Sequence, residues 1–481
     1  MVGPDDILDR LILSVSESDH LLGRDIVEGT LITGGPGSGK TTTSGRQLAH
    51  ALLRVPHSGG LILTAKAEET HNWIKYAKAC GRENDLIIFN ATSGHCFDPL
   101  HYEFTRPGRG AGDVESILDF FDTLITIGKK EIGQGHDPFW SRGATQIQRN
   151  VIVLLALAGE RVSIANIDRV IKSLPTRPDE FEEEAWQKAS YCAQVIGAIK
   201  ARKETLTPDQ WSDLDFATQY VFRKWPAFDE RPRSSLEMTW SGMADKFLFN
   251  PFNRLFCSGK CTFTPEDTTH NGKWVLCDFP LLQYGHETGR TINVMLKLIF
   301  QRAWLRRDLS ESPNLVALWQ DEFQYFIAPR WDNFFQQTCR GSRIAVVCLT
   351  QNILNLSEEL GEDQPGSKTK SFLGNLAIKI FHQQNDIETC NYAADQIGKE
   401  FKYLDNYQGG TSGSSQMYTS VGGTRQLTHI VEPVEFTRLK KPGKNPMAEA
   451  ILYKSGNTFN ATKTEQNPKG RNYLRVFFSR E

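Results

Sequence analysis

The sequence predicts an α/β protein in which helices cover a central, mostly parallel sheet. Short apolar strands alternate with helical patterns from residue 28 to about residue 100, and the same alternation returns from residue 274 onward. A mostly helical stretch separates the two parts. Three strands before residue 100 are few for a complete sheet, so one sheet interrupted by a helical insertion is the simpler interpretation.

The first part begins with a strand over residues 30–33, which feeds a glycine-rich turn and then a helix over residues 42–53. Two further strands are expected at residues 61–64 and 85–90, and a helix at residues 68–80 lies between them. This order of strand, helix and strand is typical of parallel pairing, because parallel neighbours need a long crossover connection.

The glycine-rich turn fits the phosphate-binding pattern G-x-x-x-x-G-K-[ST], and it lies between a strand and a helix as that pattern requires. Its backbone amides and the following helix N-terminus are expected to cradle phosphates. We expect Lys40 to reach the β- and γ-phosphates of ATP and Thr41 to hold Mg²⁺. The residues predicted to contact the nucleotide are Gly35, Pro36, Gly37, Ser38, Gly39, Lys40, Thr41 and Thr42.

The central stretch has apolar residues at helical spacing and no convincing strand. We expect helices over residues 114–127, 145–158, 164–174, 180–203 and 213–225. Strands then return at residues 274–278, 315–319 and 344–350, with helices over 288–306 and 331–339 between them. Residues 405–428 are rich in Gly, Ser and Thr, which predicts a flexible loop or a hairpin, and residues 447–454 and 472–479 resemble closing strands.

Composition excludes several classes of protein. The chain has 481 residues, of which 39% are hydrophobic and 23% are charged, and its formal net charge is −2. That charge gives no support to a protein that coats nucleic acid by itself, so any contact with DNA must use local patches. No apolar run of about 18 residues is present, so no membrane span is expected. The nine scattered cysteines suit reduced thiols, and the pair Cys257 and Cys261 alone is weak evidence for zinc.

A second acidic motif follows the strand expected at residues 315–319. This apolar run ends in Asp321 and Glu322. In ATPases with a phosphate-binding loop, such an Asp holds Mg²⁺ and the following Glu can polarise the attacking water. Asp-Glu after a strand is weak evidence by itself. Together with a phosphate-binding loop on the same sheet, it predicts an ATP hydrolase.

Two further polar groups follow or precede the strand at residues 344–350. Gln351 ends that strand and could contact the γ-phosphate or its water, although a simple turn residue is the alternative. Arg340 and Arg343 lie just before the strand. An arginine at a subunit edge could act on a neighbour's γ-phosphate, and a solvated basic turn is an equally good interpretation of the pattern alone.

Taken in order, these pieces resemble the TraG/TraD-type conjugative coupling proteins, within the wider HerA–FtsK group of ring-forming motor ATPases. The likeness runs from about residue 28 to residue 480. Its further segments, each quoted from this sequence, are residues 61–68, 89–90, 97–100, 137–140, 372–375 and 396–398. The phosphate-binding loop by itself is a specific signal for nucleotide binding. The other segments indicate the family mainly through their shared order along the chain.

The resemblance implies a RecA-like ATPase that forms a hexamer and moves DNA through a central pore. It implies a helical lead-in at residues 1–27, a RecA-like domain at 28–100 and 271–481, and an all-α insertion at 101–270 that binds cargo or a relaxase-like partner. By position, Arg340 matches the arginine that acts in trans better than Arg343 does. Lys40, Glu322, Arg340 and Gln351 would therefore be catalytic, with Thr41 and Asp321 on the metal.

Two departures from the family pattern are visible. Thr64 and Ala65 stand where the family has Asp-Pro before Lys66. Family members also usually begin with membrane-spanning helices, and this chain begins its ATPase part almost at once. We therefore expect a cytoplasmic protein, either free or held at the inner membrane through a type IV secretion partner.

Three functions fit the sequence. The first is an ATP-driven motor that delivers single- or double-stranded DNA, as in conjugation. A defence or packaging motor of the same superfamily, acting on phage DNA, is a related alternative that the sequence does not separate from it. The second is a secretion receptor or assembly ATPase for protein cargo, which the near-neutral charge allows. The third is a nucleotide switch with little turnover. Fold-level kinship does not separate them.

Overall fold

A nine-stranded sheet forms the centre of the computed structural model, which describes residues 7–131, 138–411 and 417–480. The strand order is β13-β12-β9-β3-β8-β7-β4-β6-β5. Strand β12 pairs antiparallel with β9 and β13, and the other pairs are parallel. The strands are β3 (Thr30–Thr33), β4 (Gly59–Leu63), β5 (Leu86–Phe89), β6 (Trp274–Cys277), β7 (Val316–Asp321), β8 (Ile344–Thr350), β9 (Ile378–Phe381), β12 (Met447–Lys454) and β13 (Tyr473–Ser479). The predicted mostly parallel sheet is confirmed.

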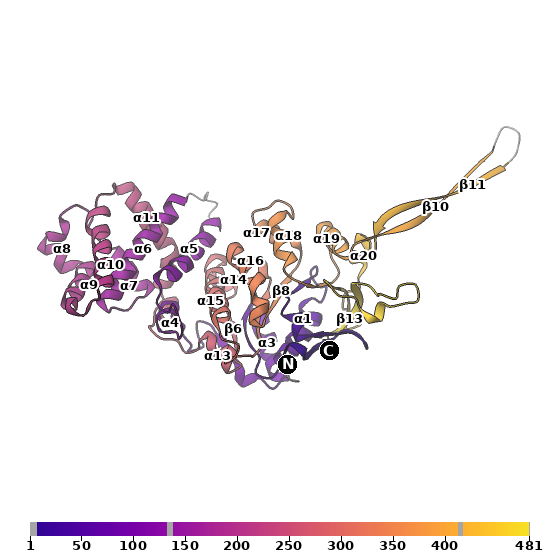
Figure 1. Cartoon of the computed structure of the whole chain (residues 1–481), viewed down its shortest axis with the longest axis horizontal. Coiled ribbons are helices and arrows are strands. Elements are labelled where there is room, and N and C mark those ends of the chain that lie inside the picture. The colour runs from indigo at the N-terminus through magenta and orange to yellow at the C-terminus, as the bar shows by residue number, and fades with distance from the viewer. Residues whose placement is uncertain (1–6, 132–137, 412–416, 481) are drawn as a thin grey trace.

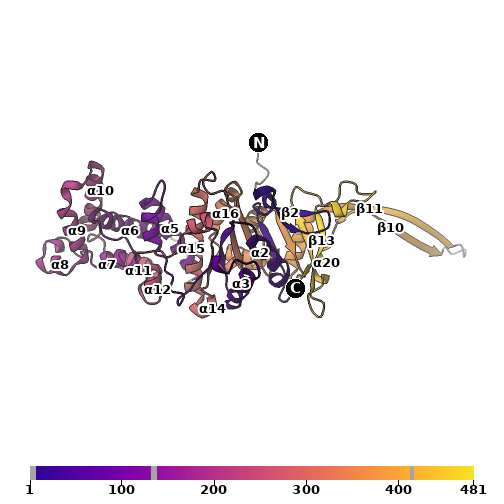
Figure 2. The ribbon, with the colours of Figure 1, turned by 90° about the horizontal axis from the view of Figure 1, so that it is seen from below.

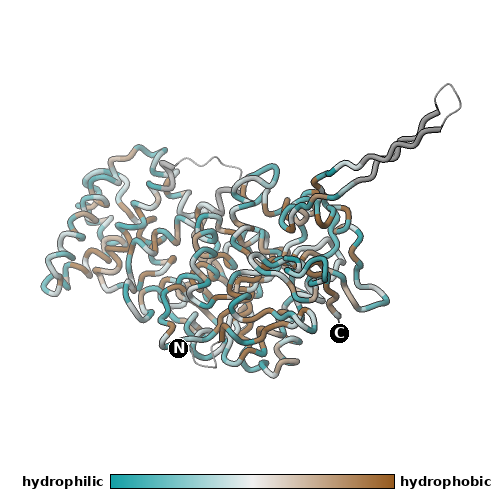
Figure 3. The backbone as a smooth tube through the Cα atoms, turned by 45° about the vertical axis from the view of Figure 1, so that its right-hand side comes forward, coloured by the Kyte–Doolittle hydropathy of each residue, from teal (hydrophilic) through white to brown (hydrophobic). Residues whose placement is uncertain are grey.

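Helices cover both faces of this sheet because successive strand residues point to opposite sides. Leu31 enters one hydrophobic core and Ile32 enters the other. Helices α2 (Arg46–Leu53) and α3 (Ala67–Ala79) pack on the Ile32 side. The Leu31 side is covered by α15 (His286–Arg306), α16 (Pro329–Thr338), α17 (Ile353–Glu359) and α18 (Ser367–Gly374). Hydrophobic stretches of the backbone accordingly run through the sheet region in Figure 3.

A helical region lies to one side of the sheet, at the left of Figure 1, between β5 and β6 in the sequence. Apart from one isolated bridge between Phe97 and Cys261, the residues described there form no β-structure. Its helices are α4 (Pro99–Thr105), α5 (Val114–Glu131), α6 (Pro138–Ala158), α7 (Ile164–Ile171), α8 (Glu184–Ala189), α9 (Tyr191–Ala201), α10 (Pro208–Gln219), α11 (Glu230–Leu248), α12 (Phe252–Phe256) and α13 (Pro265–His270). Its core is continuous with the Leu31 side of the sheet.

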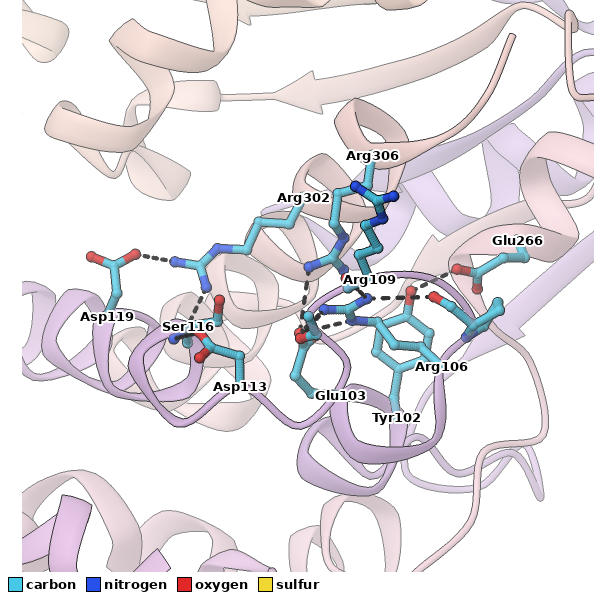
Figure 4. A network of polar contacts seen from close by, with 12 residues as sticks. Tyr102, Glu103, Arg106, Arg109, Asp113, Ser116, Asp119, Glu266, Arg302 and Arg306 are labelled. Atoms are coloured by element: carbon cyan, nitrogen blue, oxygen red, sulfur yellow. Dashed lines mark hydrogen bonds and ion pairs between the residues drawn. The ribbon is translucent and has the colours of Figure 1, made fainter. Parts of the chain in front are cut away.

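Helix α15 joins the helical region to the sheet through charged contacts (Figure 4). The Arg302 guanidinium donates to the carbonyl oxygen of Ser116 at 2.7 Å and pairs with Asp119, both on α5. One turn later, Arg306 pairs with Glu103 on α4 at 3.4 Å. Because the rest of α15 packs on the sheet, one helix contacts both parts of the molecule (Figure 2).

The segment before β3 differs from the helical lead-in predicted over residues 1–27. Its described part contains a hairpin of β1 (Leu11–Ser14) and β2 (His20–Leu22), between a short 3₁₀ helix (Ile7–Asp9) and one turn of α-helix, α1 (Gly23–Ile26). Ile12 and Leu21 are buried against the core that α2 covers. Two short apolar runs around the turn at residues 15–19 explain the hairpin, because each run buries one face only.

Near the C-terminal end, β10 (Lys399–Thr411) and β11 (Met417–His429) form a long hairpin that projects from the body (Figure 1). Of the two predictions for residues 405–428, the hairpin is therefore correct where the residues are described. The remaining helices are α14 (Leu281–Tyr284), α19 (Ile387–Ile397) and α20 (Pro433–Arg438).

One predicted helix is divided in the structure, one observed helix was not predicted, and one residue of a predicted segment lies outside the described residues. The single helix expected over 180–203 is divided into α8 and α9, because Ser190 leaves the helical conformation and its side chain caps Ala193 of α9. Helix α11 was not predicted. Asp137, the first residue of the family-like segment 137–140, lies outside the described residues. No described helix is both long and apolar enough to cross a membrane.

Candidate nucleotide-binding site

The candidate site lies where four neighbouring parallel strands end. Strand β8 pairs with β3 on one side and with β7 on the other, and β4 follows β7. The phosphate-binding loop follows β3, Glu322 follows β7, Gln351 follows β8 and Lys66 lies three residues after β4. Carboxyl ends of parallel strands meet at one edge of a sheet, and crevices at that edge commonly bind ligands.

The loop has the backbone geometry that an anion cradle needs. Gly37 and Gly39 adopt φ values of 71° and 91°, which side chains rarely tolerate. A Cβ on Gly35 would lie 2.8 Å from the amide nitrogen of Asn385. Gly37 and Gly39 are therefore favoured as glycine by their backbone conformation, and Gly39 is one of the two glycines that the sequence pattern specifies.

The helix after the loop begins with a π-helical turn at Thr41–Gly45 and continues as α2. The Thr43 hydroxyl donates to the carbonyl oxygen of Gly39 at 2.8 Å. The Ser44 Oγ lies 2.6 Å from Nε2 of the buried His382, which directly follows β9. Burial and the nearby charge of Lys40 lower the pKa of His382 to about 3, so its ring is neutral.

Glu322 is the most heavily bonded side chain of the site. Its Oε1 lies 3.3 Å from Lys40 Nζ and 3.2 Å from Lys66 Nζ. The same oxygen accepts from Gln351 Nε2 at 3.1 Å, and Oε2 accepts from Gln324 Nε2 at 3.1 Å. The residue is buried and adopts the left-handed φ of 54°, a conformation that is strained for a non-glycine residue.

Charge stabilises the ionised form of this carboxylate. Burial alone would raise the pKa of Glu322, but the ammonium groups of Lys40 and Lys66 outweigh burial and the pKa is lowered. Reciprocally, burial would lower the pKa of Lys66, and Glu322 raises it instead. Glu322 is therefore a carboxylate at neutral pH, as a base must be.

Asp321 has the opposite environment. Burial and the negative charges of Glu69 and Glu322 raise the pKa of Asp321 to about 7. Its Oδ1 is buried and receives no hydrogen bond from any residue that the structure describes. A buried carboxylate oxygen with no protein donor, repelled by two other acids, is suited to a hard divalent cation.

A buried polar group without a protein partner likewise indicates a phosphate site in the loop near Asp321. The Ser38 hydroxyl in the loop is buried and has no partner within the described residues. Within the part of the chain that the structure describes, the acceptor of the Lys40 ammonium group is the Glu322 carboxylate, so Lys40 can move to a more negative group. The donor set fits a magnesium nucleotide, with the loop and Lys40 on the phosphates and Thr41 and Asp321 on the metal.

Sequence reasoning missed several members of this cluster. Lys66 was noted only as part of a family segment, and neither Gln324 nor Glu69 was considered. His382 was missed because β9 was not predicted. Its signal is the short run Ile378–Phe381 followed by polar residues, which is too brief to distinguish from a buried loop.

Arg340 is not brought to this cluster. It lies in the short 3₁₀ helix Cys339–Ser342, before β8, whereas Gln351 follows β8. Seven strand residues separate the two ends of β8, or roughly 23 Å at about 3.3 Å per residue. The Arg340 side chain is 69% exposed and pairs with Glu28 at 3.1 Å. Arg340 thus lies at the opposite, amino-terminal edge of the sheet.

Comparison with known protein families finds one matching model, described as the TraM recognition site of TraD and TraG. It matches residues 315–441, a span that holds β7, Arg340, β8 and the β10–β11 hairpin. No curated protein matches this chain.

Solved structures of the coupling protein TrwB have a similar fold. An unbound monoclinic form of this bacterial conjugative protein has a TM-score of 0.58 and 13% identity, over 98% of this chain and 91% of that chain. A trigonal form with sulphate has a TM-score of 0.60 and 14% identity, over 95% and 86%. A complex of TrwB with a non-hydrolysable ATP analogue has a TM-score of 0.58 and 13% identity, over 98% and 92%. The RecA-like fold and the likeness to coupling proteins predicted from the sequence are confirmed.

Proposed function

We propose that this chain is the ATP-hydrolysing subunit of a ring-forming motor of the coupling-protein type, and that its substrate is DNA. The observation that carries the proposal is the convergence of Lys40, Asp321, Glu322 and Gln351 at one edge of the sheet. The likeness to a conjugative coupling protein supports the DNA substrate.

Binding of ATP would change the partner of Lys40. In the structure its ammonium group pairs with Glu322. The β- and γ-phosphates are stronger acceptors, so Lys40 would turn to them and release one contact on the carboxylate. Thr41 and Asp321 would hold Mg²⁺, which neutralises phosphate charge when it is bound. Structures of TrwB with an ATP analogue and with ADP and Mg²⁺ support this choice of ligand.

Hydrolysis would then depend on Glu322. Once Lys40 has moved, the Glu322 carboxylate accepts a proton from the attacking water, which makes the water a better nucleophile. Gln351 bonds to Glu322 at 3.1 Å, which supports a role in which it would orient that water. Lys66 stays near Glu322 and keeps it ionised until the proton is transferred.

The arginine that completes the site comes from the neighbouring subunit in this proposal. Arg340 is exposed at the amino-terminal edge, far from the nucleotide edge of its own chain. Arg343, by contrast, is half-buried, and its guanidinium donates to the carbonyl oxygen of Pro313 at 3.0 Å. Arg340 is therefore the better candidate for an arginine that acts in trans on a hexamer interface.

The helical region and the β10–β11 hairpin are candidates for partner recognition. The hairpin lies within the span that matches the TraM recognition model. We propose that a relaxase or another component of a DNA-transfer machine binds these projecting parts, in the cytoplasm or at the inner membrane.

A motor for protein cargo is the second candidate. The net charge of −2 favours it, because DNA-binding proteins are usually basic. A nucleotide switch is disfavoured by Glu322, since a switch needs no base.

The test is the ATPase rate with and without single- and double-stranded DNA, over a range of salt, with oligomer size measured in the same samples. Stimulation by DNA that weakens as salt rises, in samples that contain rings, is the expected result. Hydrolysis by rings that do not respond to DNA would favour protein cargo. Slow hydrolysis under every condition would favour a switch.

A further inference from the structure

The segment that follows Glu322 leads directly to Arg340. It comprises the 3₁₀ helix Phe323–Phe326, a short connection, α16 and the 3₁₀ helix that carries Arg340. Its two ends belong to two different half-sites in the proposed ring. Glu322 serves the nucleotide of its own chain, and Arg340 serves the nucleotide of the neighbour. A contact that fixes the middle of this segment can therefore affect the positions of both Glu322 and Arg340.

A buried ion pair fixes that middle. Lys297 of α15 is fully buried, and its Nζ lies 2.5 Å from an oxygen of Asp332 in the first turn of α16. The same ammonium group donates to the carbonyl oxygen of Phe326, also at 2.5 Å. The ion pair thus joins the central helix α15 to both the 3₁₀ helix after Glu322 and the start of α16.

Asp332 is equally well satisfied. Besides Lys297, its carboxylate accepts from the backbone N–H of Ala328 at 2.7 Å and from Gln301 Nε2 at 3.0 Å. The Ala328 bond ties the residue before α16 to the first turn of that helix. Burying a charge pair is costly, and its usual best-attested use is to specify one arrangement rather than to add stability. Here the Lys297–Asp332 ion pair specifies the path of the backbone after Glu322.

Because the backbone of Glu322 is strained, the residues that follow it must be held in place. Glu322 has a φ of 54°, a conformation that is strained for a non-glycine residue and persists only when its surroundings impose it. The preceding residue is fixed by β7 and the following turn is held by Lys297. Relaxation of Glu322 toward an ordinary conformation would redirect its carboxylate and would also shift the start of α16.

We propose that Lys297 and Asp332 are positioning residues that anchor two catalytic groups at once, Glu322 in the chain's own site and Arg340 in the neighbour's site. The pair touches neither ATP nor the metal. This inference rests on the proposed function, and it adds a physical link between adjacent sites of the ring. Movement at one nucleotide is transmitted along residues 322–340 to the arginine offered to the next.

The test uses the double variant Lys297→Met/Asp332→Leu, which removes the ion pair but keeps similar volume. The Ala328 N–H and the Gln301 amide lose their acceptor, so the folding of the variant is checked by thermal melting before kcat is measured. We expect kcat for ATP to fall about 10- to 100-fold, because small misplacement of reacting groups costs that much, with little change in ATP affinity. The control is Lys273→Met/Asp85→Leu, a partly buried pair with a 3.0 Å contact before β5 and β6, which belongs neither to residues 322–340 nor to the segment of the Arg340 partner Glu28. The control should keep wild-type kcat.

Mixed rings test the double role. A ring of the Lys297→Met/Asp332→Leu chain with Arg340→Ala chains regains activity if only Glu322 is misplaced. A ring with Glu322→Gln chains regains activity if only Arg340 is misplaced. We expect neither mixture to recover, and recovery in either would overturn the shared anchor, as would wild-type kcat in a folded double variant.

Should the double variant fail to fold by thermal melting, Gln301→Met removes one bond to Asp332 without exposing a charge. It should lower kcat severalfold, and an unchanged kcat would overturn the proposal.

The mixture of Arg340→Ala chains with Glu322→Gln chains separates failure of the shared anchor from failure of the trans-acting arginine. If that reference mixture recovers activity and the anchor variant behaves otherwise than expected, only the anchor fails. If the reference mixture itself recovers nothing in verified mixed rings, the trans-acting arginine fails and the shared anchor fails with it.

Discussion

The two edges of the central sheet differ in how their functional residues are held. At the carboxyl edge, Glu322 is buried with four side-chain partners, and Asp321 is buried beside it. At the amino edge, Arg340 is 69% exposed and has one ion pair, with Glu28. One edge is therefore a preorganised half-site, and the other presents an exposed arginine. Because the strands themselves keep the edges apart, one chain cannot bring the two halves together.

The largest effect is expected at the carboxyl edge. Lys40→Ala should lower ATP turnover about 10³-fold or more, because it removes the ammonium that contacts the transferring phosphoryl group. Lys441→Ala is the matched control, since Lys441 also reaches the loop, at 3.2 Å from the carbonyl oxygen of Pro36, but is exposed. Steady-state hydrolysis measures both. Turnover near wild type in Lys40→Ala would remove the loop from the mechanism.

Glu322→Gln should retain ATP binding and lower turnover about 10²- to 10³-fold, since an amide cannot accept the proton of water. Equilibrium binding of a fluorescent ATP analogue and single-turnover hydrolysis separate the two steps. Asp321→Asn should instead weaken the Mg²⁺ dependence. If the two variants exchanged these phenotypes, the assignment of the two acids would be wrong.

At the amino edge, Arg340→Ala should leave ATP affinity unchanged and lower turnover about 10²-fold, because the missing charge acts on the neighbour's transition state. The loss should be seen only under conditions where rings form. Arg343→Ala is the natural comparison, and loss of activity in that variant alone would move the acting arginine by three residues.

Mixing distinguishes action in trans from action in cis. A mixture of Arg340→Ala and Glu322→Gln chains should recover part of the activity, because some interfaces then pair an intact Glu322 with an intact Arg340. An arginine acting in cis gives no recovery, since every chain lacks one essential group. Mixed rings purified with two different tags and assayed for ATP turnover provide the measurement.

The same two regions show what a sequence can predict. The phosphate-binding loop, Asp321 and Glu322 were predictable because each depends on a few consecutive residues at the end of an apolar strand. Gln351 was predictable in position for the same reason. The structure brings these residues together, and their catalytic roles stay predictions.

What could not be predicted depends on contacts distant in sequence. Lys66 reaches Glu322 because β4 lies beside β7, and Lys297 meets Asp332 because α15 packs on the same face as α16. Nothing local distinguishes either lysine from a surface residue. The left-handed φ of Glu322 is imposed in the same way. The hairpin at Ile12 and Leu21 was missed because its short apolar runs also suit helix turns.

The smallest expected effect concerns stability at the carboxyl edge and depends on pH. The pKa of His382 is about 3 in the folded chain, against an ordinary value of 6.5. Between these values the unfolded chain binds one more proton, so the free energy of unfolding falls by about 1.4 kcal/mol per pH unit as pH decreases below 6.5. Asp321, whose pKa is raised to about 7, contributes with the opposite sign over part of this range.

The difference between wild type and His382→Gln isolates the histidine, because Asp321 is common to both. Denaturant unfolding at pH 7 and pH 5 should show that wild type loses about 2 kcal/mol more than His382→Gln does. His20→Gln is the control, since His20 is exposed on β2 and its variant should follow wild type. The amino edge should add little to this dependence, because an exposed pair such as Arg340 and Glu28 contributes less than about 1 kcal/mol. Equal losses in wild type and His382→Gln would mean that the ring is protonated in the folded chain, and that the half-site is less preorganised than its burial indicates.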